Sequence, residues 1–267
     1  MANIYKKFNS LSEFENYLQM NETQDAFKAY PSSQRQENEY GSFYTTTTWE
    51  KAEELLLHGD KANAEKIERG GISKERAKIR LTANRRQIFS DVSGFAPHVP
   101  NYIAGVPTAM LNARQIKVKQ KVVTLVYNVS VNGDVSGIDM QDVAIKMLSA
   151  IMRVEASGVR INLYVCDISD SSRQQIGWLL RIKSSGQHLD VLKTAYPLTN
   201  PSMLRRHSFR FTEITKGVHK SFAGGYGSAN RRADDLLKAC DLRDAKVLSY
   251  YKMRGQTSDE ITKEILS

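Results

Sequence analysis

The chain has 267 residues, of which 41 % are hydrophobic and 25 % are charged, a composition typical of a soluble globular protein that can bury a sizeable core. Its two cysteines, Cys166 and Cys240, lie in apolar patterns, so we expect reduced core residues and no structural zinc site. Neither an apolar leader nor a stretch of about 18 apolar residues occurs. The sequence therefore predicts a cytoplasmic protein that contacts no membrane.

The formal net charge is +9, and the positive charge is segregated along the chain. Residues 61–121 and residues 171–232 each carry a net +9, whereas the stretches around them are acidic or near neutral. Because crowded like charges oppose compaction, two such blocks indicate a polyanionic partner, most often nucleic acid. An evenly solvated surface on a basic protein is the alternative.

Residues 1–84 are predicted to form a mainly helical, partly irregular extension. Ser10 and Glu13 have the spacing of a capping box and precede an apolar stripe, which predicts a helix over residues 10–20. The polar residues 21–47 are predicted to be loop. Further helices are expected over residues 48–57, 62–68 and 73–82.

Residues 85–267 are predicted to form an α/β core domain. The β-branched runs at 121–130 and 159–168 are typical of strands buried on both faces of a parallel sheet, with a helix over 139–157 between them. A strand at 177–184 follows too closely for a crossover helix and should therefore run antiparallel, as an edge hairpin.

The rest of this domain is predicted to alternate between helix and strand. Helices are expected at 189–196 (broken by Pro197), from Pro201, at 231–239 and at 258–266, and a last strand at 245–251.

The loop after the first core strand lies where ligands collect in open α/β sheets. The order of elements resembles the von Willebrand A-type fold, whose metal site opens with Asp-x-Ser-x-Ser. Here the loop reads Asn128-x-Ser130-x-Asn132, and a neutral amide in place of the first carboxylate weakens the binding of a hard cation. We therefore predict no metal and no cofactor, and expect these polar groups to satisfy a tight turn. The predicted fold class is an α/β, von Willebrand A-like or Rossmann-like sandwich with an antiparallel edge hairpin and a helical N-terminal extension.

Residues 212–232 combine glycines, aromatics and basic residues in one predicted loop. Gly224, Gly225 and Gly227 permit close backbone approach, while the rings of Phe222 and Tyr226 are suited to stacking on unpaired bases. The alternative is a long surface loop whose aromatics pack on the domain.

These features together predict a binding site for single-stranded nucleic acid. Phe222 and Tyr226 would stack on bases, and basic side chains would bind phosphates. For the first basic group an exposed helix face is the alternative, and for the lysines at 117–121 the alternative is edge-strand protection. The predicted phosphate contacts are Lys74, Arg76, Arg80, Arg85, Arg86, Lys117, Lys119, Arg205, Arg206, Arg210, Lys216, Lys220, Arg231 and Arg232.

An enzyme is not predicted, because the chain has no nucleophile elbow, P-loop or GxGxxG motif. A nuclease using Asp134, Asp167 or Asp170 is a minor alternative.

Three stretches resemble a family of phage- and plasmid-borne proteins, mostly hypothetical, and the resemblance covers about residues 45–230. They are Trp49-x-x-Ala52-x-x-Leu55-x-x-x-Gly59; Asp91-Val92-Ser93-Gly94 leading to Val99-Pro100-x-x-x-Ala104-Gly105-x-Pro107-x-x-Met110; and Asn200-Pro201-Ser202-Met203-Leu204-Arg205-Arg206 followed by Gly224-Gly225-Tyr226-Gly227. These motifs imply no particular chemistry.

In size, basicity and phage character the chain is also similar to the single-stranded-DNA-binding activators of certain podoviruses, which recruit a phage-encoded heterodimeric RNA polymerase. That resemblance implies a non-enzymatic factor in phage transcription or replication, with single-stranded DNA and a phage RNA polymerase as partners in the infected host's cytoplasm. The tail at 259–267 is the candidate polymerase contact, and a helix docked on its own domain is the alternative. The alternative function is a von Willebrand A-like protein-interaction module of a phage complex, with a degenerate metal site.

Overall fold

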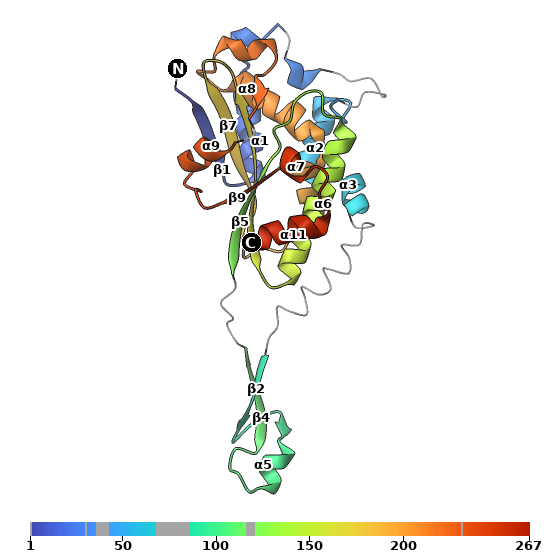
Figure 1. The fold of residues 1–267 in the computed structure, drawn as a ribbon, viewed down its shortest axis with the longest axis vertical. Helices are drawn as coiled ribbons and strands as arrows, with labels where there is room; N and C mark the ends of the chain where they lie inside the picture. The colour runs from blue at the N-terminus through green and yellow to red at the C-terminus, as the bar shows by residue number, and fades with distance from the viewer. Residues whose placement is uncertain (1, 30, 36–42, 68–85, 116–120, 231) are drawn as a thin grey trace.

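A computed structural model describes residues 2–29, 31–35, 43–67, 86–115, 121–230 and 232–267 (Figure 1). The main sheet has the strand order β1-β7-β6-β5-β9, and β8 pairs with β6 beside this path. β5 is parallel to β6 and β9, whereas β6 and β7 are antiparallel. This mixed sheet and its helices confirm the predicted α/β fold class. The strands are β1 (Ile4–Phe8), β5 (Val122–Asn128), β6 (Arg160–Asp170), β7 (Gln175–Lys183), β8 (Ser228–Ala229) and β9 (Lys246–Ser249).

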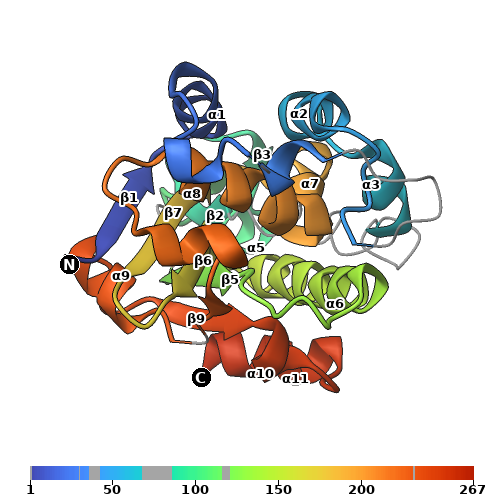
Figure 2. The same ribbon diagram turned by 90° about the horizontal axis from the view of Figure 1, so that it is seen from above.

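Helices lie on both faces of the sheet (Figure 2), and each face carries a core of buried side chains. The larger core lies on the face covered by α1 (Leu11–Met20), α6 (Gly137–Ala156), α7 (Val191–Thr199) and α8 (Phe209–Ile214). A smaller core packs α9 (Asp234–Ala239) on the other face, with the free thiols Cys166 and Cys240 inside it. Alternating side chains of the predicted β-branched strands supply both cores, as their apolar pattern requires.

Three of the predicted N-terminal helices are present in the described residues, and both α1 and β1 are part of the main fold rather than of a separate extension. Ser10 caps α1, and Thr48 caps α2 (Trp49–His58), which ends at Gly59 with a φ of 92°. α3 (Lys61–Ile67) follows, and the helix predicted at 73–82 lies outside the described residues. β1 was not predicted, because a five-residue strand with two lysines has no buried-strand pattern. It runs parallel to β7, so the expectation that β7 forms the sheet edge was wrong.

Several boundaries in the C-terminal third differ from the prediction, and the largest differences are at the ends of α7 and of the last strand. α7 continues two residues past Pro197, although this proline removes one N–H from the hydrogen bonds of the helix. A π-helix, η4 (Met203–Ser208), and then α8 follow. The last strand ends at Ser249, whose side chain caps α10 (Tyr250–Met253). α11 (Ser258–Leu266) buries Ile261 and Ile265 and packs against α6, so the terminal helix docks on its own domain.

Residues 86–115 form a second, three-stranded antiparallel sheet, which we call the arm. Its order is β2-β4-β3, with α5 beside it, and it lies apart from the rest of the molecule in Figure 1. The assignment of these residues to the core domain was therefore wrong. The elements are β2 (Arg86–Asp91), β3 (Ala96–Pro97), α5 (Val99–Ile103) and β4 (Met110–Gln115). No helix in the described part of the chain is long and apolar enough to cross a membrane.

Candidate functional site

A cavity of about 360 Å³ opens where β5 ends, and we call it the edge pocket. Because β6 runs parallel to β5, both strands bring their carboxyl ends to this edge of the sheet. The loop at 130–133 forms one wall, and the glycine loop at 225–229 forms another. Asp167 of β6, Arg205 of η4 and Phe43 also line the cavity.

Asp167 is the acidic group of the edge pocket. The Ser130 hydroxyl donates to its Oδ1 at 2.7 Å, and the amide of Ile168 donates to Ser130 Oγ at 2.8 Å. Burial raises the pKa of Asp167 to about 6, against the opposing effect of hydrogen bonds from Ser130 and Ser208. The carboxyl group therefore changes charge close to neutral pH.

The polar groups of the loop after β5 satisfy a turn, as predicted. Asn128 Oδ1 accepts from the Ser130 amide at 2.9 Å, and its Nδ2 donates to the carbonyl of Asn230 at 2.9 Å. The amide of Asn132 donates to the hydroxyl of Tyr251 at 3.0 Å. Within the described residues, no group of three His, Cys, Asp or Glu side chains is placed to hold a metal ion.

Arg205 is buried, with 2 % of its surface exposed, so its predicted role as a phosphate contact was wrong. Its guanidinium donates to the carbonyls of Phe43, at 2.7 Å, and of Val135. The same group lies 4.2 Å from the centre of the Phe43 ring. Arg205 thus holds Phe43 at the edge pocket through two contacts, one with the backbone carbonyl of Phe43 and one with its ring.

Arg206 is fully buried, and its predicted phosphate contact was wrong for the same reason. Its guanidinium donates to both the hydroxyl and the carbonyl of Thr46, at 2.8 and 2.7 Å. Two further hydrogen bonds, of 2.9 and 2.8 Å, reach the carbonyls of Ser33 and Arg35. One planar side chain therefore holds together two parts of the predicted N-terminal loop.

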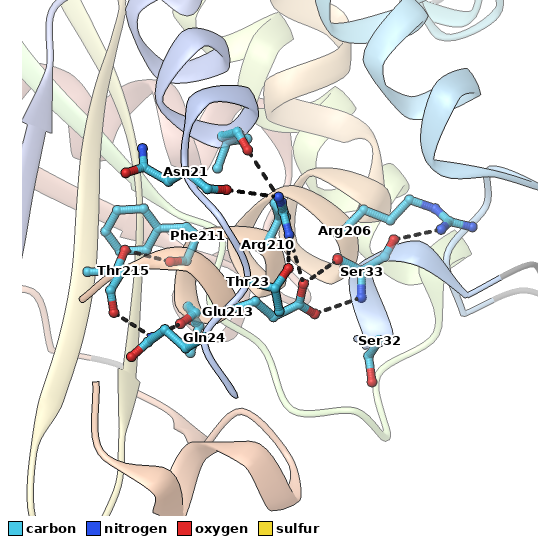
Figure 3. A network of polar contacts seen from close by, with 12 residues as sticks. Asn21, Thr23, Gln24, Ser32, Ser33, Arg206, Arg210, Phe211, Glu213 and Thr215 are labelled. Carbon is cyan, nitrogen blue, oxygen red and sulfur yellow. Dashed lines mark hydrogen bonds and ion pairs between the residues drawn. The ribbon is translucent and has the colours of Figure 1, made fainter. Parts of the chain in front are cut away.

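Glu213 of α8 completes this interior network, which we call the buried arginine network (Arg205, Arg206 and Glu213). Its carboxylate accepts from the amide and hydroxyl of Ser33, at 3.0 and 2.5 Å (Figure 3). The hydroxyl of Tyr226 donates to it at 2.6 Å. A fully buried carboxylate needs such donors, because its hydration is lost.

The two aromatic residues predicted to stack on bases, Phe222 and Tyr226, are internal, so this prediction was wrong. Phe222 is fully buried. The ring of Tyr226 stacks on Phe209 at 4.1 Å, and its hydroxyl also accepts from the Ser32 amide at 2.9 Å. The alternative, aromatics that pack on their own domain, is what the structure shows.

The remaining predicted contacts divide into three groups. Arg210 is also turned inward, with its guanidinium bonded to the Thr23 hydroxyl and to the carbonyls of Asn21 and Leu18, so it is not a phosphate contact. Lys216, Lys220 and Arg232 are exposed. The third group lies outside the described part of the structure: Lys74, Arg76, Arg80, Arg85, Lys117, Lys119, Arg231 and the side chain of Arg86.

Phe43 and Phe209 line the edge pocket but were not predicted. Phe43 follows a polar stretch and has no periodic apolar neighbours that would single it out. Phe209 lies in an apolar helical pattern that is typical of core positions.

One family model, described as a domain of unknown function (DUF7192), matches residues 2–267. The chain belongs to this family. No curated protein and no solved structure matched it. Since the match spans the arm as well as the main sheet, both are parts of the DUF7192 unit.

Replacing Arg206 by lysine should destabilise the protein by about 3 kcal/mol, because one ammonium cannot reproduce the planar set of hydrogen bonds. Urea denaturation measures the change in the free energy of unfolding. The matched control is Arg232→Lys at an exposed position, where we expect a change within about 0.5 kcal/mol. An equally small effect of Arg206→Lys would contradict a structural role for this guanidinium.

Replacing Asp167 by asparagine should alter how stability depends on pH. Since the pKa of Asp167 is raised to about 6, the folded state binds this proton more tightly than the unfolded state, and the resulting stability is lost as pH rises through 6. The free energy of unfolding of Asp167→Asn, minus that of wild type, should therefore be about 1 kcal/mol larger at pH 8 than at pH 5.

The difference between Asp167→Asn and wild type does not contain the pH dependence of stability that His207 contributes. Burial lowers the pKa of His207 to about 3, which gives an opposite pH dependence, but that residue is common to both. Urea denaturation at the two pH values is the measurement. A stability difference that does not change with pH would show that Asp167 has an ordinary pKa.

Proposed function

We propose that this DUF7192 protein is a non-catalytic binding protein for single-stranded nucleic acid, and that one unpaired base enters the edge pocket. The observation that carries the proposal is the pocket itself, at the low end of the volume range of small-ligand sites. One of its walls carries Phe43, whose side chain is 36 % exposed. A base stacked on an aromatic ring gains about 1–3 kcal/mol whatever its identity.

The charge around the glycine loop supports the same partner. Lys216 and Lys220 are exposed on the segment that leads to the pocket-lining residues 225–229, and Arg232 is exposed just after it. The chain as a whole carries +9. Cations at these positions can bind the phosphates on either side of an inserted base. Gly225 and Gly227 are exposed and leave the backbone uncovered for close approach.

Binding should weaken steeply with salt. With Lys216, Lys220 and Arg232, the exposed described cations on either side of the glycine loop, as the phosphate contacts, log K is expected to fall with log salt with a slope of about −2 on a single strand. Phe43→Ala should weaken binding about 10-fold through the loss of stacking. Fluorescence anisotropy of a labelled 12-nucleotide single strand, titrated across a salt series, measures both.

Tyr102→Ala is the matched control, because it removes an exposed aromatic ring from the arm. It should leave the affinity within two-fold. No detectable binding at low salt would contradict the proposal, and so would equal affinities of wild type and Phe43→Ala.

A protein-interaction module is the second candidate, and the arm favours it. No described side chain of the arm is buried, and seven large apolar ones are exposed between positions 88 and 106. The arm has few charged residues (Arg86, Asp91 and Arg114), so its surface suits an apolar protein surface better than phosphates.

The double variant Tyr102→Ser, Ile103→Ser should reduce the binding of the apolar dye ANS by the native protein, because these side chains are 74 % and 78 % exposed. Its free energy of unfolding should stay within about 0.5 kcal/mol of wild type. Dye fluorescence and urea denaturation test this. A large loss of stability, or unchanged dye binding, would show that the arm is covered by its own chain.

A further inference from the structure

We infer that the edge pocket selects among unpaired bases, and that the carboxylate of Asp167 reads the hydrogen-bond donors on the base edge. This inference rests on the proposed function, because it names which base the pocket takes. It follows from the way the polar groups of the pocket are already bonded.

The hydroxyl of Ser130 cannot serve a ligand as a donor. Its oxygen accepts from the Ile168 amide, and its hydrogen is directed to Asp167 Oδ1. Arg205 is engaged as well, since its guanidinium donates to the carbonyls of Phe43 and Val135. Asp167 is thus a carboxylate on the pocket wall, and the structure records no ion pair to it among the described residues.

An ionised carboxylate only accepts hydrogen bonds, and its two oxygens have more acceptor sites than the hydroxyls of Ser130 and Ser208 and the backbone N–H of Ile168 occupy. Guanine offers two parallel donors, N1–H and N2–H, which match a carboxylate. Cytosine and adenine each offer one amino donor beside an acceptor nitrogen. Thymine offers N3–H between two carbonyl oxygens, which would face the carboxylate. The pocket is therefore expected to prefer guanine and to reject thymine, because unmatched buried acceptors are costly.

The preference should depend on pH through Asp167. The charged or titratable groups among the described lining residues are Asp167, Arg205 and Tyr226. Arg205 stays charged, and burial together with Glu213 raises the pKa of Tyr226. His207, next to Ser208 on η4, stays neutral because burial lowers its pKa. Among the described groups that line the pocket, Asp167 is therefore the one that gains a proton between pH 8 and pH 5, and a protonated carboxyl loses its pure acceptor character.

The test uses the full chain and four labelled 12-nucleotide strands of thymidine that carry dG, dC, dA or dT at one central position. At pH 8 we expect the strand with dG to bind about 10-fold more tightly than the all-thymidine strand, which corresponds to one well-matched base contact. Asp167→Asn should reduce this ratio to within two-fold. The matched control is Asp134→Asn, at an exposed acidic residue of the loop after β5, which should keep the ratio. At pH 5 the wild-type ratio should also fall.

The outcomes separate the two proposals. If no strand binds, the proposed function fails and the inference fails with it. If all four strands bind with equal affinity, the proposed function survives and the inference is overturned. A preference for dG that Asp167→Asn retains would overturn the role of Asp167, and urea denaturation of the variant confirms that it is folded.

Discussion

The structure depends on the burial of two consecutive arginines. Arg205 and Arg206 lie inside the protein, where an unsolvated guanidinium is tolerated only if acceptors surround it. The acceptors come from Ser33, Arg35, Phe43, Thr46 and Val135, mostly as backbone carbonyls. A polar segment with little regular structure is thereby fixed to η4, about 160 residues further along the chain.

The same network shapes the edge pocket. Arg205 holds Phe43 on one wall, and Glu213 holds Tyr226 at the glycine loop. Both residues line the pocket from segments without long helices or strands, so hydrogen bonds to buried charges position them. A ligand that enters here meets a wall preorganised by the fold, which lowers the entropic cost of binding.

Periodicity in the sequence predicted the parts of the fold that bury apolar surface. β5, α6 and β6 follow directly from their apolar patterns. β1 and the arm could not be predicted in this way, since β1 is short and half-buried and no described side chain of the arm is fully buried. The arginines were misassigned because charge is visible in a sequence whereas distant acceptors are not. One signal was available: Arg205 and Arg206 lie between Leu204 and Phe209, in an apolar helical stretch.

Hydrogen exchange at the backbone amide of Ser33 tests most directly whether the buried arginine network anchors this segment. This amide donates to the buried carboxylate of Glu213, while the carbonyl of Ser33 accepts from Arg206. If the buried arginine network anchors this segment, hydrogen exchange at the Ser33 amide should be as slow as in the core strands β5 and β6. Exchange as fast as in a solvated loop would contradict the anchoring, and with it the origin of the edge pocket.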